Sequence, residues 1–349
     1  MPANPFLGVF LHALGGFAAG SFYIPFKKVQ KWAWESYWLV GGFFSWIIAP
    51  WVVSLIICPD VMGVLTNAPA KSLFWAFLFG VLWGIGGLTF GLSMRYLGMS
   101  LGYALALGFC AAFGTIIPPV FKGEFVDLAS KLSGQTVLLG VLVCLTGIAI
   151  CGKAGVKKEG ELTADQKTAA ISEFNFSKGL WIAIFAGVMS ACMAFALQAA
   201  KPIADLAVAV GTDSLWQYSP AYIVIFAGGF LTNCVWCVTL NRRNRTAINY
   251  IRGEGISLAS NYLFSALAGI TWYMQFMFYG MGTTRMGDYD FSSWTIHMAF
   301  IIVFSNMWAL LFKEWKGTSR RTHQIVFAGI IVLIASTIVV GYGNYLASR

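Results

Sequence analysis

The most regular feature of this chain is a series of ten long stretches that contain no Asp, Glu, Lys or Arg. Each stretch is close to the roughly 20 residues that a helix needs to cross a bilayer. Because backbone groups in lipid must be hydrogen-bonded within their own segment, the stretches are predicted to be helices. The predicted fold is an all-α polytopic membrane protein with ten transmembrane helices, at residues 5–26, 36–58, 72–94, 97–121, 134–152, 179–200, 216–240, 259–282, 292–312 and 324–346.

A polar stretch at 152–178 divides the spans into two groups of five, and the groups share a spacing of glycines and tryptophans. The matched positions are Gly41-Gly42-Phe43 with Gly228-Gly229-Phe230, Gly80-x-x-Trp83 with Gly269-x-x-Trp272, and Gly140 with Gly329. Their near-constant offset predicts an internal repeat. Equivalent spans lie five apart, an odd number, so they cross the membrane in opposite directions. We expect two inverted five-helix repeats, residues 1–151 and 179–349, joined by a cytoplasmic linker at 152–178.

An inverted repeat is typical of secondary transporters, in which a site near the bilayer midplane opens to each side in turn. The alternative is a duplication that serves packing alone. With 58% hydrophobic and 11% charged residues, the composition excludes an ordinary soluble domain. The sequence has no phosphate-binding loop and no hydrolase motif, so we expect neither an ATP-driven pump nor an enzyme, and no cofactor.

The net charge of +9 is unevenly distributed. If the chain begins outside, 17 of the 23 Lys and Arg residues fall on the inner side of the membrane. The positive-inside rule therefore predicts that both termini lie outside, in the periplasm. This distribution indicates contact with the lipid bilayer and excludes nucleic acid as the partner.

Few polar side chains occur within the predicted spans, and such residues are the first candidates for function because burying them in lipid is costly. His12 and His297 lie in the outer half of the bilayer, on spans from opposite repeats. Asp290 precedes His297 by seven residues, so the two can share a helix face and exchange a proton. The alternatives are that the histidines form structural hydrogen bonds between helices and that Asp290 pairs with Arg285. A divalent metal on these three residues is less favoured, because no close ligand spacing supports it.

Several amides and aromatic rings lie near these groups. Trp272 precedes Gln275 by three residues, and Trp294 precedes His297 by three. An amide beside a flat ring suits a neutral, polyhydroxylated ligand, because hydroxyls need hydrogen bonds and the C–H face of a sugar needs an apolar platform. The predicted substrate-binding residues are Gln275, Trp272, Gln198, Trp294, Asn233, Tyr289 and Tyr23. Packing alone is the alternative for each of them.

Two charged side chains are candidates for gates. Glu35 follows a polar and aromatic turn between the first two spans, where it can close an inner gate or accept the proton. Arg285 lies in the outer link between the eighth and ninth spans. No metal site is predicted at either place.

Several strings along the whole chain resemble the L-rhamnose/proton symporter family of the drug/metabolite transporter superfamily. They are Phe22-Tyr23-x-Pro25-Phe26-Lys27-Lys28-Val29, Trp32-x-Trp34-Glu35, Met94-Arg95-Tyr96-Leu97-Gly98-Met99-Ser100, Ala199-Ala200-Lys201-Pro202, Trp272-Tyr273-x-Gln275-Phe276, Tyr289-Asp290 with Ser293-Trp294 and His297-Met298, and Lys313-Glu314-Trp315. The resemblance implies ten helices in two inverted halves, a bacterial inner-membrane location and proton-driven uptake of L-rhamnose.

The predicted function is proton-coupled symport of L-rhamnose or a close deoxyhexose by alternating access. We expect Asp290, His297 and His12 to carry the proton, and the sugar to bind in an outward-open state. The alternatives are an exchanger or symporter of another small metabolite from the same superfamily, and a multispan sugar sensor or channel. The sequence predicts no oligomeric state.

Overall fold

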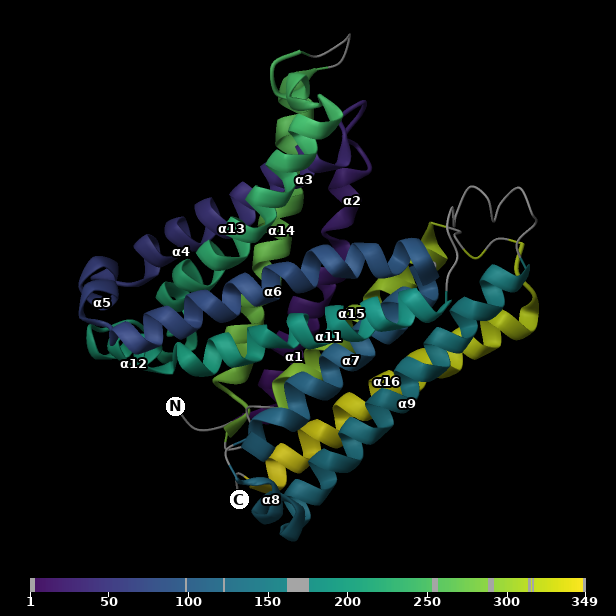
Figure 1. Cartoon of the computed structure of the whole chain (residues 1–349). Helices are drawn as coiled ribbons and strands as arrows, with labels where there is room; N and C mark the ends of the chain where they lie inside the picture. The colour runs from purple at the N-terminus through teal and green to yellow at the C-terminus, as the bar shows by residue number, and fades with distance from the viewer. Residues whose placement is uncertain are drawn as a thin grey trace.

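The computed structural model describes residues 4–97, 99–121, 123–161, 176–252, 257–287, 292–312, 315 and 317–347. This part of the chain is helical and contains no strand (Figure 1). The helices are α1 (Pro5–Ser21), α2 (Tyr23–Phe26), α3 (Trp34–Phe43), η1 (Phe44–Ile48), α4 (Ala49–Ile57), α5 (Val61–Asn67), α6 (Ala70–Leu97), α7 (Met99–Phe121), α8 (Phe125–Ser130), α9 (Leu132–Glu161), α11 (Phe176–Ala199), α12 (Lys201–Ala209), η2 (Ser214–Trp216), α13 (Ser219–Asn244), η3 (Ala247–Tyr250), α14 (Leu258–Thr283), α15 (Ser293–Leu311) and α16 (Arg320–Ala347).

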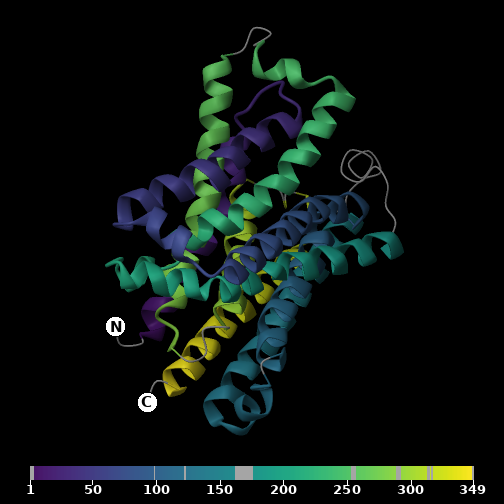
Figure 2. The ribbon, with the colours of Figure 1, turned by 60° about the vertical axis from the view of Figure 1, so that its left-hand side comes forward.

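Eight helical segments in the described residues are long and apolar enough to cross a membrane, which makes the protein an all-helical polytopic membrane protein. They are Pro5–Phe26, Trp34–Ile57, Ala70–Phe90, Leu132–Lys158, Ser177–Ala209, Ser214–Asn244, Ser293–Leu311 and Arg320–Ala347. The two chain ends lie close together, at the same end of the molecule as α8 (Figures 1 and 2). We call this the terminal end, and the opposite end, near the connection between α2 and α3, the linker end.

The long helices α9 and α16 pack side by side along the edge of the molecule (Figure 1). Two glycines bring them close together. A side chain at Gly140 of α9 would overlap Val340 of α16, and a side chain at Gly329 of α16 would overlap Cys151 of α9. Small residues allow helices to approach in lipid, where close van der Waals packing holds them together.

Two further crossings depend on glycine in the same way, and we call them the two seams. In the α3–α14 seam, a side chain at Gly269 would overlap the carbonyl of Gly41. In the α6–α13 seam, a side chain at Gly228 would overlap the carbonyl of Phe77, and one at Gly80 would overlap the carbonyl of Ile225. In both seams the two backbones therefore touch.

The predicted second span is not one regular helix. It consists of α3, a π-helical turn at Phe44–Ile48 and α4, which has Pro50 in its first turn. Proline fits the first turn of a helix because its missing N–H has no partner there anyway. The π-helical turn changes the direction of the side chains, and Ser45 and Trp46 are buried within it.

The predicted linker at 152–178 begins inside a helix. Helix α9 continues to Glu161, and the end of the predicted linker lies in α11, while residues 162–175 lie outside the described residues. Glu161 accepts hydrogen bonds from the backbone N–H of Ser319 (2.6 Å) and from the hydroxyls of Ser319 (2.6 Å) and Thr322 (2.8 Å). These bonds cap the start of α16 and lower the pKa of Glu161 to about 2.

Candidate functional site

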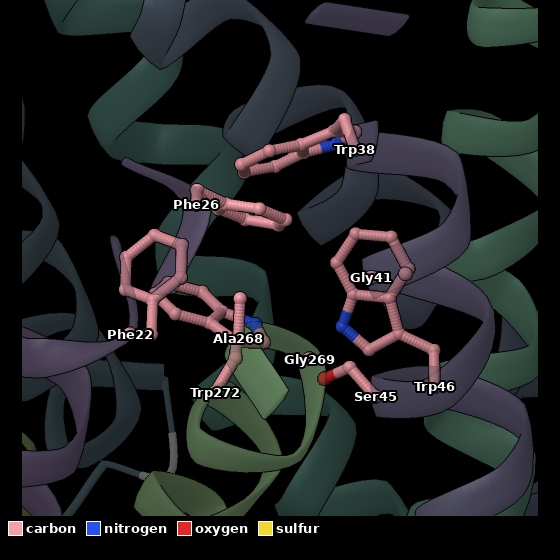
Figure 3. Close-up of a pocket in the computed structure, with 10 residues that line it drawn as sticks. Phe22, Phe26, Trp38, Gly41, Ser45, Trp46, Ala268, Gly269 and Trp272 are labelled. Atoms are coloured by element: carbon pink, nitrogen blue, oxygen red, sulfur yellow. The ribbon is translucent and has the colours of Figure 1, made fainter. Parts of the chain in front are cut away.

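A small pocket of about 10 Å³ lies where α2 and the residue before it, Phe22, meet α3, η1 and α14 (Figure 3). Its aromatic lining residues are Phe22, Phe26, Trp38, Trp46 and Trp272. Its small lining residues are Gly41, Gly42, Ser45, Ala268 and Gly269. The pocket therefore sits on the α3–α14 seam, where glycines leave room and bulky rings form the walls.

Three buried polar atoms in this pocket have no hydrogen-bond partner among the residues that the structure describes. They are the Ser45 hydroxyl and the indole N–H groups of Trp46 and Trp272. A buried donor without a partner costs on the order of 1–3 kcal/mol, so most such groups in proteins are paired. Three of them in one small pocket mark a place that a polar ligand can complete.

Residues behind the pocket hold its walls in place. Asn233 of α13 accepts a hydrogen bond from the Trp38 indole N–H (3.1 Å) and donates one to the carbonyl of Gly229 (2.9 Å). The hydroxyls of Tyr23 and Tyr37 are hydrogen-bonded to each other at 3.3 Å, and the Tyr37 ring packs on Phe26. Asn233 and Tyr23, both predicted to bind substrate, thus lie next to the pocket and not in its lining.

Glu35 joins two parts of the linker end. Its carboxylate accepts hydrogen bonds from the Asn244 amide (3.0 Å) and the Thr246 hydroxyl (2.7 Å). Next to it, the Ser36 hydroxyl donates to Asn249 at 3.1 Å. Only 5% of Glu35 is exposed. The predicted gate residue therefore connects the start of α3 to the segment after α13.

The two predicted histidines lie together, closer to the terminal end. His12 of α1 and His297 of α15 are fully buried, and their ring centroids are 6.1 Å apart. The Tyr279 ring of α14 packs against both, at 5.3 and 5.2 Å. No ring nitrogen of either histidine has a hydrogen-bond partner in the described residues.

Glycines make room for this histidine pair. A side chain at Gly15 would come within 2.9 Å of the His297 ring, and one at Gly282 would come within 2.8 Å of the His12 ring. His12 lies on α1 and Phe22 directly follows that helix, ten residues later, which corresponds to about 15 Å along a helix. The histidine pair and the pocket are therefore separate sites, and α14 contributes residues to both.

The histidines are covered at the terminal end by the start of α1 and the turn after α14. The Asn4 N–H donates to the carbonyl of Arg285 at 3.0 Å, and Gly8 lies against the sulfur of Met286. Arg285 is 8% exposed, and its Nε has no partner in the described residues. The predicted outer gate residue is therefore part of a closed cover.

The other predicted site residues have different places. Trp294 packs against Tyr279 at 5.5 Å and donates its indole N–H to the carbonyl of Cys110 at 3.1 Å. Gln275 is 2% exposed, and its amide nitrogen has no partner among the described residues. Gln198 is half-buried near the end of α11 and does not line the pocket. Asp290 and Tyr289 lie outside the described residues.

The sequence analysis singled out the amides and the histidines as candidate site residues. It missed most of the pocket lining, including Ser45, Trp46 and Trp38. One signal was available. Ser45 follows Gly41 by four residues, and Trp46 follows Gly42 by four, so each small residue shares a helix face with a residue able to form a hydrogen bond.

Comparison with known proteins gives a consistent result. The family model for L-rhamnose-proton symport protein (RhaT) matches residues 1–346. An L-rhamnose-proton symporter of Cronobacter sakazakii is 41% identical over 344 residues, covering 97% of each chain. Those of Klebsiella pneumoniae and Shigella flexneri are 40% identical over 344 residues, again covering 97% of each chain. The chain therefore belongs to the L-rhamnose-proton symport protein family, a family of membrane transporters and not of enzymes.

Proposed function

We propose that this protein takes up L-rhamnose together with a proton across the bacterial inner membrane. Membership of the family over residues 1–346 supports this function. The structural observation that carries it is the aromatic pocket with three unpaired polar atoms on the α3–α14 seam (Figure 3). The same pocket accounts for the kind of substrate.

The sugar binds in this pocket. A deoxyhexose has apolar C–H faces and a methyl group, which pack on the rings of Phe22, Trp46 and Trp272. Its hydroxyls accept hydrogen bonds from the two indole N–H groups and pair with the Ser45 hydroxyl, all of which lack partners in the described residues. Asn233 supports Trp38 from behind.

The coupled proton binds at His12 and His297. The two imidazoles lie edge to face with ring centroids 6.1 Å apart, and two neighbouring imidazoles can share one proton when the protonated ring donates and the neutral ring accepts. Asp290, in the link before α15, supplies the proton from outside. Gln275 and Trp294 lie on the same helices as Tyr279 and His297 and shape this second site, while Gln198 stays near the outer surface.

The architecture is two inverted repeats of five spans. The contacts of the paired glycines support it. Gly140 faces Val340 and Gly329 faces Cys151, and the same offset of 189 positions relates Gly140 to Gly329 and Cys151 to Val340. Helices α7 and α14 supply two spans beyond the eight most apolar ones. Residues 1–151 and 179–349 form the repeats, and the distribution of basic residues puts both termini in the periplasm.

Transport proceeds by alternating access. The cover formed by Asn4, Gly8 and the turn at Arg285 closes the outer side, whereas the pocket lies nearer the linker end. This arrangement fits an inward-facing state. Glu35 and Arg285 act as the inner and outer gate residues, since each links segments that must separate. Proton and sugar together favour the switch because each binds one conformation more tightly than the other.

The direct test is uptake of radiolabelled L-rhamnose by proteoliposomes under an imposed pH gradient. We expect uptake to rise when the outside is acidic and to fall when a protonophore removes the gradient. Uptake that ignores the gradient would contradict proton coupling and favour an exchanger. Counterflow with a panel of sugars then identifies the substrate, and non-saturating flux would indicate a channel.

The histidine pair is tested by His12→Gln and His297→Gln. Each variant is expected to lose most of the pH dependence of uptake, because glutamine keeps a polar side chain but cannot bind the proton. His323→Gln is the matched control, since His323 lies at the start of α16, where it contacts Thr318 and Ser319. If His12→Gln and His297→Gln both keep the full pH dependence of uptake, the proton binds at another site.

A further inference from the structure

A groove with cationic and apolar residues runs along one end of the α9–α16 pair. It is lined by Ile150 and Lys153 of α9 and by Arg321, Gln324, Ile325 and Ala328 of α16. The residues from α16 follow the pattern i, i+3, i+4 and i+7 from Arg321 to Ala328, so they share one face of that helix. The groove is far along the chain from the sugar pocket and the histidine pair, and transport chemistry does not account for it.

The polarity of the groove changes along its length. Lys153, Arg321 and Gln324 are exposed towards the C-terminal end of α9 and the N-terminal end of α16. Ile150 and Ala328 lie about one turn deeper on their helices. A phospholipid has the same polarity, with a charged headgroup at the surface and acyl chains in the hydrocarbon layer.

Neighbouring cationic residues have partners among the described residues, whereas the structure describes no ion pair for those in the groove. Lys157 pairs with Glu161 at 3.8 Å, and Lys158 lies over the Trp315 ring at 4.8 Å. Lys153 and Arg321 make no ion pair with any residue that the structure describes. Both charged side chains of the groove are positive, so it is complementary to an anion.

We propose that an anionic phospholipid binds in this groove, with its phosphate between Lys153 and Arg321 and an acyl chain along Ile150 and Ala328. Basic pockets between helices on the cytoplasmic side are suited to anionic headgroups. Gln324 donates a further hydrogen bond to the headgroup. Because Gly329 holds α9 and α16 in contact next to the groove, the bound lipid bridges the two helices.

The experiment measures lipid binding to the full chain in mild detergent by native mass spectrometry, with phosphatidylglycerol and phosphatidylcholine of identical acyl chains as probes. We expect wild type to retain phosphatidylglycerol in preference to phosphatidylcholine. Lys153→Gln with Arg321→Gln should bind phosphatidylglycerol roughly 30-fold more weakly, at about tenfold for each 1.4 kcal/mol and about 1 kcal/mol for each basic residue.

Two further variants make the result specific. Arg242→Gln with Arg243→Gln removes the same charge from exposed positions at the end of α13 and should leave the affinity unchanged. Ala328→Trp fills the apolar part of the groove, keeps both charges and should weaken lipid binding. Equal affinity of wild type and the groove variant, equal loss in the α13 control, or equal binding of the two lipids would overturn the proposal. Displacement of the lipid by inorganic phosphate would show that only an anion site is present, and would overturn it too.

Discussion

The α3–α14 and α6–α13 seams have similar backbone contacts but different side-chain packing. In both, glycines let two helices touch at their backbones. In the first, a small pocket remains beside the glycines, with Trp272 packed against Phe22 at 4.3 Å. In the second, the ring of Trp83 lies on Gly229 and against Phe226 at 5.7 Å. The same helix crossing therefore makes a cavity in one seam and a packed core in the other.

The polar side chains that follow the glycines also differ between the two seams, in their hydrogen bonds. Thr232 and Asn233 follow Gly228-Gly229 at the positions that Ser45 and Trp46 occupy after Gly41-Gly42. The Thr232 hydroxyl donates to the carbonyl of Val81 at 3.0 Å, and Asn233 is bonded to protein on both sides. Ser45 and Trp46 have no such bonds. One seam thus uses its polar groups for its own stability, and the other keeps them available for a ligand.

The largest effect is expected from adding a methyl group at the crossings. Gly80→Ala and Gly269→Ala should each destabilise the fold by about 3 kcal/mol, because the new methyl overlaps a backbone carbonyl that cannot move away. Thermal unfolding in detergent measures the change. Gly87→Ala on α6 is the control, since nothing lies within 4 Å of the new methyl, and it should be neutral. If the alanine is tolerated in one seam and not in the other, the two helix crossings are not equivalent.

The next effect separates the two tryptophans. Trp272→Phe keeps an aromatic ring but removes an N–H that has no partner among the described residues, so sugar affinity should fall about tenfold, while the smaller ring also loses some packing on Phe22. Trp83→Phe, in the filled seam, should change affinity much less. Binding of L-rhamnose by isothermal titration measures both. Equal losses of affinity would show that the pocket is not the sugar site.

A smaller effect should have opposite outcomes in the two seams. Ser45→Ala should weaken sugar binding several-fold and leave stability unchanged, because its hydroxyl has no partner in the described part of the chain and is proposed to bond to the sugar. Thr232→Val should lower stability by about 1 kcal/mol, through loss of the bond to Val81, and leave affinity unchanged. Sugar titration and thermal unfolding on the same two samples are the measurements. If Ser45→Ala alters stability and not affinity, its hydroxyl serves the fold.

The smallest effect is expected outside both seams, at the Glu161 cap. The pKa of Glu161 is lowered to about 2, mainly by the Ser319 hydrogen bonds, against an ordinary value near 4.5. Its stabilising effect is therefore complete above about pH 4.5 and is lost as the pH falls through about 2. The difference in melting temperature between wild type and Glu161→Gln should shrink over that range. The seam variants do not change Glu161, so their difference in melting temperature from wild type should not follow the titration of this carboxylate.

The sequence was sufficient to predict an all-helical fold, because long charge-free stretches that cross lipid must pair their backbone groups within each segment. It also singled out His12 and His297 as candidates, because an imidazole in an apolar span is unusual, and in the structure the two rings are neighbours, edge to face. The pocket could not be predicted from the sequence. Its formation depends on contacts such as Phe22 with Trp272, which are far apart in the chain, and on the π-helical turn that directs Ser45 inward.

The bond between the Asn4 N–H and the Arg285 carbonyl has a practical consequence for protein engineering. It fixes the beginning of α1 over the turn that covers the histidine pair. A fusion partner placed ahead of Met1 adds bulk beside this contact, so in the proposed alternating-access cycle we expect it to change how often the cover opens. Affinity tags and fluorescent reporters should therefore follow the last helix, and an N-terminal fusion becomes a deliberate means of changing the turnover rate.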